Sequence, residues 1–504
     1  MTLTRLALVT LLCCPVAAAA EVASVMDFGA KADGVTNDAA AIQKAIDAAT
    51  GAGGGVVLLP PGNYLTGTIH LKSNVTLRIS AGATLWGSRR AEDYKPMHLI
   101  YARGAQNIAI EGDGTINGNG DAFWLPDFKP RERRPSPAIE LVECKDVRIE
   151  DVKIRNTAGW GIHPLVCERV FIRGISMISD YRGPNTDGID PDSSRDVVIS
   201  DCYIETGDDA IVIKTTGRLS IPPPPSENIT VTNCVLLSDD AALKLGTESH
   251  GDFRNIVFSN CAIKKTRVGL AIYAKDGGVF ENVSFSNIAI ETEPTHPNSV
   301  EYPIFIDLEK RFDDSRASRV RDINFSGITI HSRGRILAGG MPEHPLEDLT
   351  FRNVFLRSTG YEPVEQQKKP RGSSRVRPAP PEIDYSPAPS ALVFANVRGL
   401  SLDNVGVVWD SQEPPQPRHA IYAARVEDLS IRGFSGRAAE PGGRYAAIGL
   451  DQAKRVFISG SRLEGKGVFL GLRKTPAAEI LLSGNDLRQA DAETKQGALY
   501  VHIP

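Results

Sequence analysis

The sequence predicts an all-β chain that folds as a right-handed parallel β-helix, a solenoid, with an N-terminal capping helix. The first observation behind this prediction is a short repeated phrase. Its clearest copies are Asp196–Cys202, Asn228–Cys234, Asn255–Cys261, Asn282–Ile288 and Asp322–Ile328. The first four copies start 32, 27 and 27 residues apart. A repeat of roughly 20–50 residues is the signature of a solenoid.

The second observation is the pattern inside each copy. Apolar and polar residues alternate, as in Asn255–Cys261, and this is the period of a strand and not of a helix. Val, Ile, Phe and Thr dominate, and Asn, Asp or Gly bound each run. Coils of about 25 residues with two or three short strands describe a parallel β-helix. Its coils stack about 4.8 Å apart, with an aliphatic interior and ladders of Asn or Cys at the turns.

Two segments break the repeat. Residues 36–50 place apolar side chains at positions 42, 45, 46 and 49, which form one face of a helix with Thr36 or Asn37 as its N-cap. Such a helix would cap the first coil. Residues 362–392 are rich in Pro, Lys, Arg and Ser and predict a long excursion between coils. We interpret its basic cluster as a solvated loop, with a contact to an acidic polymer as the alternative.

The first twenty residues predict a signal peptide at 1–20. Arg5 gives a positive start, Leu6–Leu12 is mostly apolar, and Ala18–Ala20 forms a small-residue cleavage pattern. We therefore expect a secreted or periplasmic protein, with a cap segment at 21–70 and the β-helix at 71–504. No later apolar run reaches the roughly 20 residues of a membrane span.

Composition narrows the possible partners. Hydrophobic residues make up 41% and charged residues 23% of the 504 residues, and the net charge is −4. The sequence is therefore typical of a folded globular chain, and no basic stripe predicts a nucleic acid partner.

The cysteines beyond the signal peptide are expected to be buried thiols and not disulfides, because three of them end copies of the repeat. They are Cys144, Cys167, Cys202, Cys234 and Cys261.

Acidic residues gather in three neighbouring coils, in the groups Asn185–Asp190, Gly207–Asp209 and Ser238–Asp240. Asp187 precedes Asp208 by 21 residues, and Asp208 precedes Asp239 by 31, each close to one coil. Stacking therefore brings the carboxylates to one edge of one face. Neighbouring carboxylates raise at least one pKa, which gives the acid and base that glycosidic cleavage needs. The alternatives are ordinary turn residues and a calcium site.

These motifs resemble glycoside hydrolase family 28, the polygalacturonases and their relatives. Asn185–Asp187, Gly207–Asp209 and the step of 21 residues match the family's two acidic motifs. Val25–Gly34 resembles its N-terminal segment, and the region of Trp160 and His163 resembles the segment before the first acidic motif. The similarity covers roughly residues 25–330.

The resemblance implies an inverting hydrolase of α-glycosidic bonds in pectin or a related plant polysaccharide. It makes Asp208 the general acid and Asp187 and Asp209 the groups that activate water. We expect a monomer that binds a polysaccharide or oligosaccharide, with no cofactor and no metal. The candidate substrate-binding residues are Asn185, His163, Lys214, Asp240, Lys244, Arg267 and Tyr273.

Two departures from the family pattern leave the exact polysaccharide open. Ala241 stands where the family's Gly-His-Gly motif has its His. Ala271 and Tyr273 stand where the family's Arg-Ile-Lys motif, which grips a sugar carboxylate, has its two cations.

Two lysines are candidates to replace the missing cations. Strand alternation predicts that Lys244 points outward between Val212 and Ala271. Lys244 would then replace the lost Arg, and we expect Lys214 to stand beside Tyr273 in place of the lost Lys. Solvated lysines with no such role are the competing hypothesis.

Two other functions compete with hydrolysis. One is a polysaccharide lyase of the same fold, which needs calcium or another cation and a strong base. The other is a non-catalytic carbohydrate-binding β-helix, against which the presence of all three aspartates argues.

Overall fold

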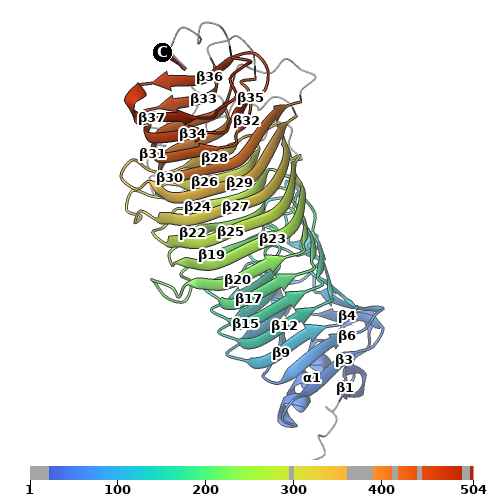
Figure 1. Ribbon diagram of the computed structural model, residues 1–504. Helices are drawn as coiled ribbons and strands as arrows, with labels where there is room; N and C mark the ends of the chain where they lie inside the picture. The colour runs from blue at the N-terminus through green and yellow to red at the C-terminus, as the bar shows by residue number, and fades with distance from the viewer. Residues whose placement is uncertain are drawn as a thin grey trace, which may run out of the picture.

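The structure is a long solenoid of stacked parallel strands with one α-helix at its N-terminal end (Figure 1). The computed structural model describes residues 22–294, 300–359, 390–410, 418–439, 445–490 and 500–502. The predicted signal peptide and the basic cluster of the excursion lie outside these residues. Successive coils build three parallel sheets, which we number 1 to 3, so the predicted β-helix is confirmed.

Sheet 1 carries the acidic coils. Its strands are β5 (Ile69–His70), β8 (Ile100–Arg103), β11 (Ile139–Val142), β14 (Ile162–Leu165), β19 (Ile211–Thr215), β22 (Ala241–Ser249), β24 (Val268–Ala274), β26 (Tyr302–Leu308), β28 (Ile336–Gly339), β33 (Ala446–Asp451), β36 (Val468–Arg473) and β38 (Tyr500–His502). Between β14 and β19 the sheet continues through isolated bridges, in which Ile189 pairs with Ile162 and Ile211, and Asp192 pairs with Leu165 and Lys214.

Sheets 2 and 3 complete each coil. Sheet 2 contains β1 (Val22–Ser24), β3 (Gly55–Leu59), β6 (Val75–Ile79), β9 (Gln106–Glu111), β12 (Lys145–Glu150), β15 (Glu168–Arg173), β17 (Arg195–Ser200), β20 (Ser226–Thr232), β34 (Lys454–Ser459) and β37 (Ile480–Ser483). Sheet 3 contains β2 (Asp33–Asn37), β4 (Gly62–Thr66), β7 (Ala83–Gly87), β10 (Thr115–Asn117), β13 (Lys153–Arg155), β16 (Ser176–Ile178), β18 (Tyr203–Thr206), β21 (Val235–Ser238), β32 (Ser435–Gly436) and β35 (Arg462–Leu463).

Longer strands pass from one sheet into the next. They are β23 (Phe253–Thr266), β25 (Val279–Thr292), β27 (Arg319–Ser332) and β29 (Leu346–Ser358), which run through sheets 2 and 3, β31 (His419–Arg432), which runs through sheets 1 and 2, and β30 (Ser390–Trp409), which contributes to all three. Short 3₁₀ helices are η1 (Val25–Phe28), η2 (Ala91–Asp93), η3 (Gly120–Phe123) and η4 (Ala477–Glu479). The predicted excursion at 362–392 is too long at its end, because residues 390–392 belong to β30.

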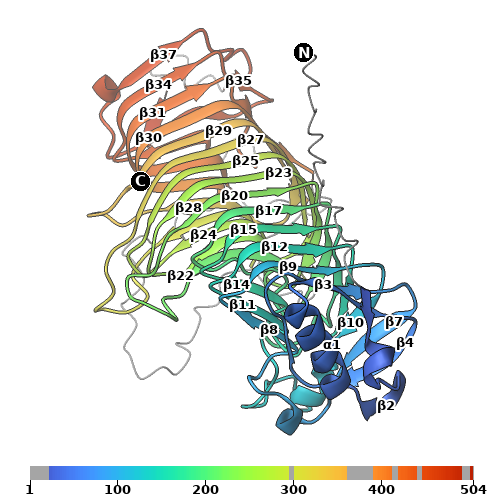
Figure 2. The ribbon, with the colours of Figure 1, turned by 90° about the horizontal axis from the view of Figure 1, so that it is seen from below.

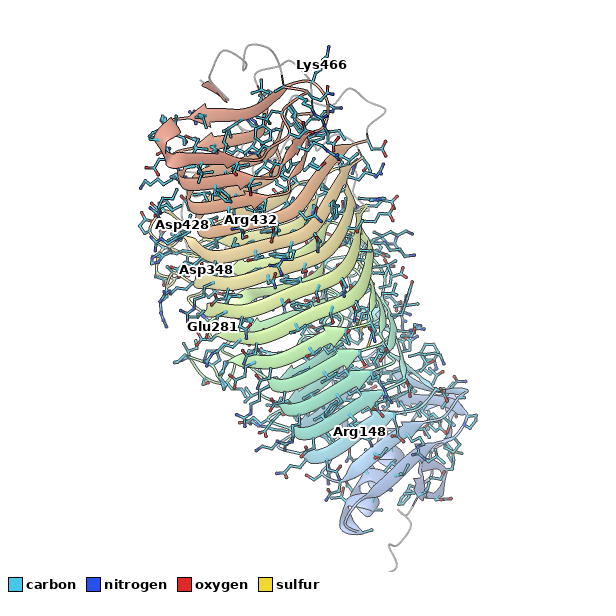
Figure 3. The ribbon with its side chains drawn as sticks, in the orientation of Figure 1. Arg148, Glu281, Asp348, Asp428, Arg432 and Lys466 are labelled. Atoms are coloured by element: carbon cyan, nitrogen blue, oxygen red, sulfur yellow. The ribbon has the colours of Figure 1, made fainter. Side chains whose placement is uncertain are left out.

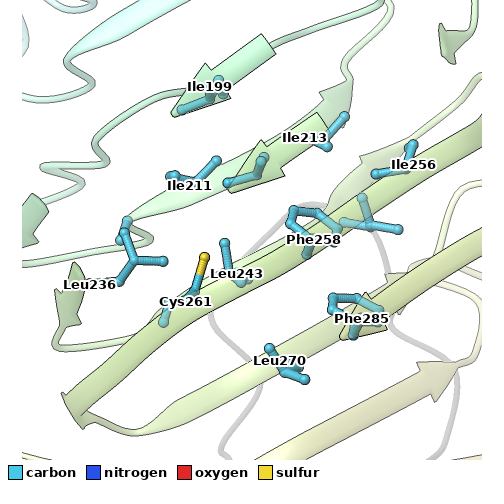
Figure 4. Packing of buried hydrophobic residues seen from close by; sticks show 14 of the residues in the cluster. Ile199, Ile211, Ile213, Leu236, Leu243, Ile256, Phe258, Cys261, Leu270 and Phe285 are labelled. Atoms are coloured by element: carbon cyan, nitrogen blue, oxygen red, sulfur yellow. The ribbon is translucent and has the colours of Figure 1, made fainter. Parts of the chain in front are cut away.

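The interior consists of rows of like side chains that stack along the solenoid axis. Ile, Leu, Phe and Cys side chains from successive coils point inward together (Figure 4). Phe258 stacks on Phe285 at 4.8 Å between ring centroids, and Phe285 stacks on Phe325 at 5.0 Å. The five predicted thiols are buried and free, as expected. Dense apolar rows of this kind supply most of the driving force for folding.

A ladder of Asn and Asp side chains confirms the predicted turn rows. Asn255 has φ of 54°, in the left-handed region that Asn and Asp tolerate better than most residues. Its amide donates to Asn228 Oδ1 at 3.0 Å and accepts from Asn282 Nδ2 at 2.8 Å. Asn228 in turn donates to Asp196 at 3.0 Å. The start of the repeated phrase is therefore fixed by backbone conformation and by hydrogen bonds between coils.

Helix α1 (Ala39–Gly51) caps the first coil, as predicted (Figure 2). Its four predicted apolar residues, Ile42, Ala45, Ile46 and Ala49, are buried. The N-cap is Asp38 and not Thr36 or Asn37. The Asp38 carboxylate does not cap the helix, because it accepts hydrogen bonds from the backbone N–H groups of Lys31 and Ala32.

The outer face of sheet 2 is covered by charged side chains, several of which Figure 3 labels. Glu281 lies 3.9 Å from Arg254 and also pairs with Arg321, and Arg455 pairs with Asp428 at 2.6 Å. Exposed pairs of this kind contribute little to stability. Their arrangement indicates that sheet 2 faces solvent. Among the described residues, no helix is long and apolar enough to cross a membrane.

Asn255→Ala should lower the free energy of unfolding by about 2 kcal/mol, because alanine is strained at positive φ and cannot bridge Asn228 and Asn282. Asn255→Gly also removes the hydrogen bonds, but glycine adopts a positive φ without strain. Its loss of unfolding free energy should therefore be smaller. Urea unfolding midpoints of the two variants measure the difference. Equal losses would show that the backbone conformation contributes nothing.

Candidate active site

Three successive turns place the acidic residues at the edge where sheet 1 begins. Asp187 precedes Ile189, Asp208 and Asp209 precede β19, and Asp239 and Asp240 precede β22. Ile189 pairs with Ile211, and Ile211 pairs with Leu243, so the three turns are in register. The stacking predicted from the residue spacing therefore follows from the pairing of the strands.

The catalytic candidates form one compact carboxylate cluster. One side-chain oxygen from each of Asp187, Asp208 and Asp209 lies within 4.8 Å of the others. Asp187 and Asp209 are buried, whereas Asp208 is partly exposed. The amide of Asn185 donates to Asp208 Oδ2 at 3.3 Å, and the backbone N–H of Asp209 donates to Asp208 Oδ1 at 2.9 Å. Asp208 is thus the member of the cluster that a substrate can reach.

Two buried lysines lie among these carboxylates. Lys244 Nζ lies 2.6 Å from Asp209 Oδ2. Lys214 Nζ lies 3.6 Å from Asp187, 3.7 Å from Asp190 and 3.4 Å from Glu248. Both lysine side chains are less than a tenth exposed. They neutralise part of the negative charge that would otherwise prevent so many carboxylates from packing together.

Burial and mutual repulsion shift the pKa values of the three aspartates. Burial, together with the charges of Asp187 and Asp209, raises the pKa of Asp208 well above its usual range. Burial and Asp190 likewise raise the pKa of Asp187, against the opposing charge of Lys214. Burial also raises the pKa of Asp209, but its contact with Lys244 opposes this rise. Asp209 is therefore the carboxylate with the strongest local support for its ionised form.

Asp190 is a member of this cluster that the sequence did not single out as a site residue. It is fully buried, and neither of its side-chain oxygens has a hydrogen-bond partner among the residues that the structure describes. Asp187 Oδ1 is buried in the same way. Burial raises the pKa of Asp190 well above its usual range, which Lys214 opposes. Its place in the acidic phrase Asn185–Asp190 was the signal that could have identified it.

The predictions for the positions of the two lysines have different outcomes. Lys244 lies between Val212 and Ala271 on neighbouring strands, as predicted. The expectation that Lys214 stands beside Tyr273 is wrong. Lys214 pairs across the sheet with Asp192, and its ammonium lies 4.6 Å from the centre of the Trp160 ring. Lys244 itself lies 5.0 Å from the Tyr273 ring.

Two further predicted binding residues form an ion pair with each other. Arg267 pairs with Asp240, with Nε 2.9 Å from Oδ1. Tyr273 lies on β24 and is partly buried. Burial raises its pKa to about 12, against the effect of Arg267. Arg267 directly precedes β24 and Tyr273 lies near its end, so both belong to the coil after that of Asp240.

His163 does not have the substrate-facing position that the sequence predicted. Its side chain is fully buried, with Nδ1 2.6 Å from Glu140 and Nε2 3.3 Å from Asp192. The guanidinium of Arg218 lies 3.3 Å from Glu140. We therefore revise its role from substrate binding to positioning. Its ring lies edge-on to Trp160, 5.2 Å between centroids, and Trp160 in turn lies beneath Lys214.

Several site residues were missed by sequence reasoning. Glu140 and Asp192 stand one coil to either side of His163, and their spacing of 23 and 29 residues was a usable signal. Arg134 gave no such signal. It lies on an irregular segment, and its guanidinium donates to the carbonyl of Pro184 at 2.6 Å and to Asn185 Oδ1 at 3.2 Å.

The fold and this cluster define a parallel β-helix with a stacked carboxylate site. The sequence profile of glycosyl hydrolases family 28 matches residues 55–373. Because this match covers more than half of the chain, the protein belongs to glycosyl hydrolases family 28.

Individual relatives agree with this assignment. A probable polygalacturonase from Vitis vinifera is 33% identical over 217 residues, 38% of this chain and 44% of that protein. An exo-poly-alpha-D-galacturonosidase from Dickeya chrysanthemi is 28% identical over 291 residues, 45% of this chain and 48% of that protein. The chain thus matches less than half the length of either relative.

Solved structures extend the similarity along the solenoid. A hyperthermoactive exopolygalacturonase from Thermotoga maritima is 27% identical with a TM-score of 0.58, covering 68% of this chain and 87% of that one. A family 28 exopolygalacturonase from Yersinia enterocolitica has a TM-score of 0.60 at 20% identity, covering 82% of this chain and 79% of that one, and shows the shared fold.

The buried His163 network predicts a pH-dependent contribution to stability. Burial lowers the pKa of His163, but the hydrogen bonds to Asp192 and Glu140 outweigh it and raise the pKa overall. Its contribution is therefore complete below the unfolded value of about 6.5 and is lost as the pH rises through the folded value. Burial raises the pKa values of Glu140 and Asp192, but contacts with His163 outweigh it and lower both. Their contributions are lost only at acidic pH.

His163→Gln should cost about 3–5 kcal/mol near pH 6, and the cost should shrink as the pH rises through the folded pKa of His163. Unfolding midpoints measured from pH 5 to 9 test this. His419→Gln is the matched control, because burial lowers the pKa of His419 to about 4 and its ring is neutral over the whole range. A cost for His163→Gln that does not change with pH would contradict a charged imidazole.

Proposed function

We propose that this protein is a secreted, polygalacturonase-like glycoside hydrolase that cleaves α-glycosidic bonds in pectin or a related plant polysaccharide with inversion. The observation that carries the proposal is the carboxylate cluster that Asp187 on one turn forms with Asp208 and Asp209 on the next turn of a family 28 solenoid. Secretion rests on the signal peptide predicted at 1–20. A monomer remains the expected state.

Asp208 is the proposed general acid. It is the accessible member of the cluster, and its raised pKa keeps the carboxyl group protonated at a pH where an ordinary aspartate is ionised. A protonated carboxyl group can donate to the glycosidic oxygen as the bond breaks. The amide of Asn185 holds the other oxygen of this carboxyl group in place.

Asp209 is the proposed principal base. The ion pair with Lys244 favours its ionised form, which can accept a proton from water. Asp187 is the proposed second group that activates this water, because one of its side-chain oxygens lies within 4.8 Å of those of Asp208 and Asp209. Lys214 limits the charge of the Asp187 and Asp190 pair. Lys244 and Lys214 thereby act on the reaction through the carboxylates that they contact.

Inversion is supported by the family motifs and not by the spacing of the carboxylates. Inverting pairs of carboxyl groups usually lie about 6.5–9.5 Å apart, and the clustered oxygens here lie within 4.8 Å. The anomer released first, observed by proton NMR during early hydrolysis, tests the proposal directly. Release of the retained anomer would overturn inversion without affecting hydrolysis.

The proposed function is tested by reducing ends released from a panel of pectic polymers. A hydrolase releases them without the unsaturated products that absorb near-ultraviolet light, and calcium chelation leaves its rate unchanged. Unsaturated products that require calcium would identify a lyase instead. Binding without any cleavage would identify a carbohydrate-binding solenoid.

Asp208→Asn should reduce the rate of hydrolysis about 10²–10⁴-fold, the usual cost of losing a general acid. The wild-type rate should rise as Asp209 ionises and fall as Asp208 ionises, giving a bell-shaped pH profile whose alkaline limb the variant lacks. Circular dichroism confirms that the fold is intact. A variant with a rate within tenfold of wild type would refute this role.

Lys244→Met should move the acidic limb of the pH profile of kcat/KM upward by about one pH unit or more, because Asp209 loses its nearest cation. Lys244→Arg keeps the charge and should return the limb toward its wild-type position. A limb that stays in place in Lys244→Met, with only KM raised, would show that Lys244 contacts substrate and not the base.

A further inference from the structure

An apolar patch lies on the outer face of sheet 1, immediately beyond the carboxylate cluster. Its buried members come from β22, β24, β26, β28 and β30, with partly buried side chains packed against them. The patch consists of Ala241, Val268, Ala271, Tyr302, Leu337 and Val393, with Tyr273, Val300 and Phe305 packed against it.

Strand register connects this patch to the site. Lys244, which contacts Asp209, pairs across the sheet with Ala271, and Ala271 pairs with Phe305. The rings of Tyr273 and Phe305 meet edge to face at 5.3 Å, and Phe305 stacks on Tyr302 at 4.4 Å. Tyr273 and Phe305 keep part of their surface exposed. A chain bound across Asp208 and running toward the C-terminal coils would therefore lie on these two rings.

Within the described part of the chain, the cations Lys244, Arg267 and Lys275 beside the patch are already paired with protein carboxylates. Lys244 pairs with Asp209, and Arg267 pairs with Asp240. Lys275, 5.9 Å from the Tyr273 ring, pairs with Asp307 and Glu309. A substrate carboxylate here would have to break one of these ion pairs or lie unpaired against apolar side chains, and both are costly.

We propose that the sugar unit that binds over β24 and β26 carries no negative charge. Its C–H face packs on the rings of Tyr273 and Phe305, because the negative face of an aromatic ring attracts weakly positive hydrogens. The fitting chemistry is a neutral sugar or a uronate neutralised as its methyl ester. This inference rests on the proposed hydrolase function and specifies its substrate class.

Three oligosaccharides that differ only in the unit over β24 and β26 test the proposal. That unit is galacturonic acid, its methyl ester or galactose. The wild-type protein should cleave at least one uncharged form with kcat/KM about tenfold or more above the free acid, and the preferred form identifies which neutral unit is bound. Equal or faster cleavage of the free acid would overturn the inference and leave hydrolysis standing. If the protein cleaves none of the three oligosaccharides and no pectic polymer, the proposed function itself is overturned.

Phe305→Leu removes the ring but keeps an apolar side chain, and it should lower kcat/KM on the uncharged substrate about tenfold. Phe355→Leu is the matched control, since Phe355 is an exposed phenylalanine on β29 outside this patch. Phe305→Lys should shift the preference toward the free acid. Thermal unfolding confirms that each variant is folded. Equal effects of Phe305→Leu and Phe355→Leu, or an unchanged preference in Phe305→Lys, would overturn the role of the patch.

Discussion

The in-register pairing of parallel strands is the constraint on which the rest of the structure depends. Each coil position lies directly above its counterpart on the preceding coil, about one strand spacing away. Stacking then acts in the same way on every residue type. Phenylalanines form the row from Phe258 to Phe325, asparagines form the ladder through Asn255, and aspartates form the carboxylate cluster.

Such stacking stabilises apolar rows but is costly for charged ones. Asp187 and Asp209 stand in one row and Asp208 adjoins them. These carboxylates repel each other, and burial increases that repulsion because the local dielectric is low. The chain offsets the cost by interleaving cations, with Lys244 between Val212 and Ala271 and Lys214 between the coils of Asp187 and Glu248. Burial, together with the negative charge of Asp187 and Asp209 that the lysines leave unbalanced, raises the pKa of Asp208. The chemistry of the site is thus set by how incompletely its charges are compensated.

The sequence predicted those features that depend on period alone. Strand alternation and coil length were sufficient for the solenoid, the helix over the first coil, the outward position of Lys244 and the gathering of Asp187, Asp208 and Asp209. It did not predict features that depend on the reach and direction of side chains. Lys214 turns toward Trp160 and not toward Tyr273. The resemblance of its region to the family suggested that His163 contacts substrate, but carboxylates on both neighbouring coils enclose it.

The patch around Phe305 lies on different coils from the carboxylates, although one sheet carries both. In the proposed function, bond cleavage and substrate selection depend on separate stretches of chain. Strand pairing joins these stretches, as does Lys244, whose ammonium contacts Asp209 and lies 5.0 Å from the Tyr273 ring. In this proposal, a mutation in β26 would alter which polymer is accepted while leaving the proposed acid and base untouched. The solenoid accordingly allows substrate preference to diverge by exchange of surface residues along a row, with no need to rebuild the catalytic machinery.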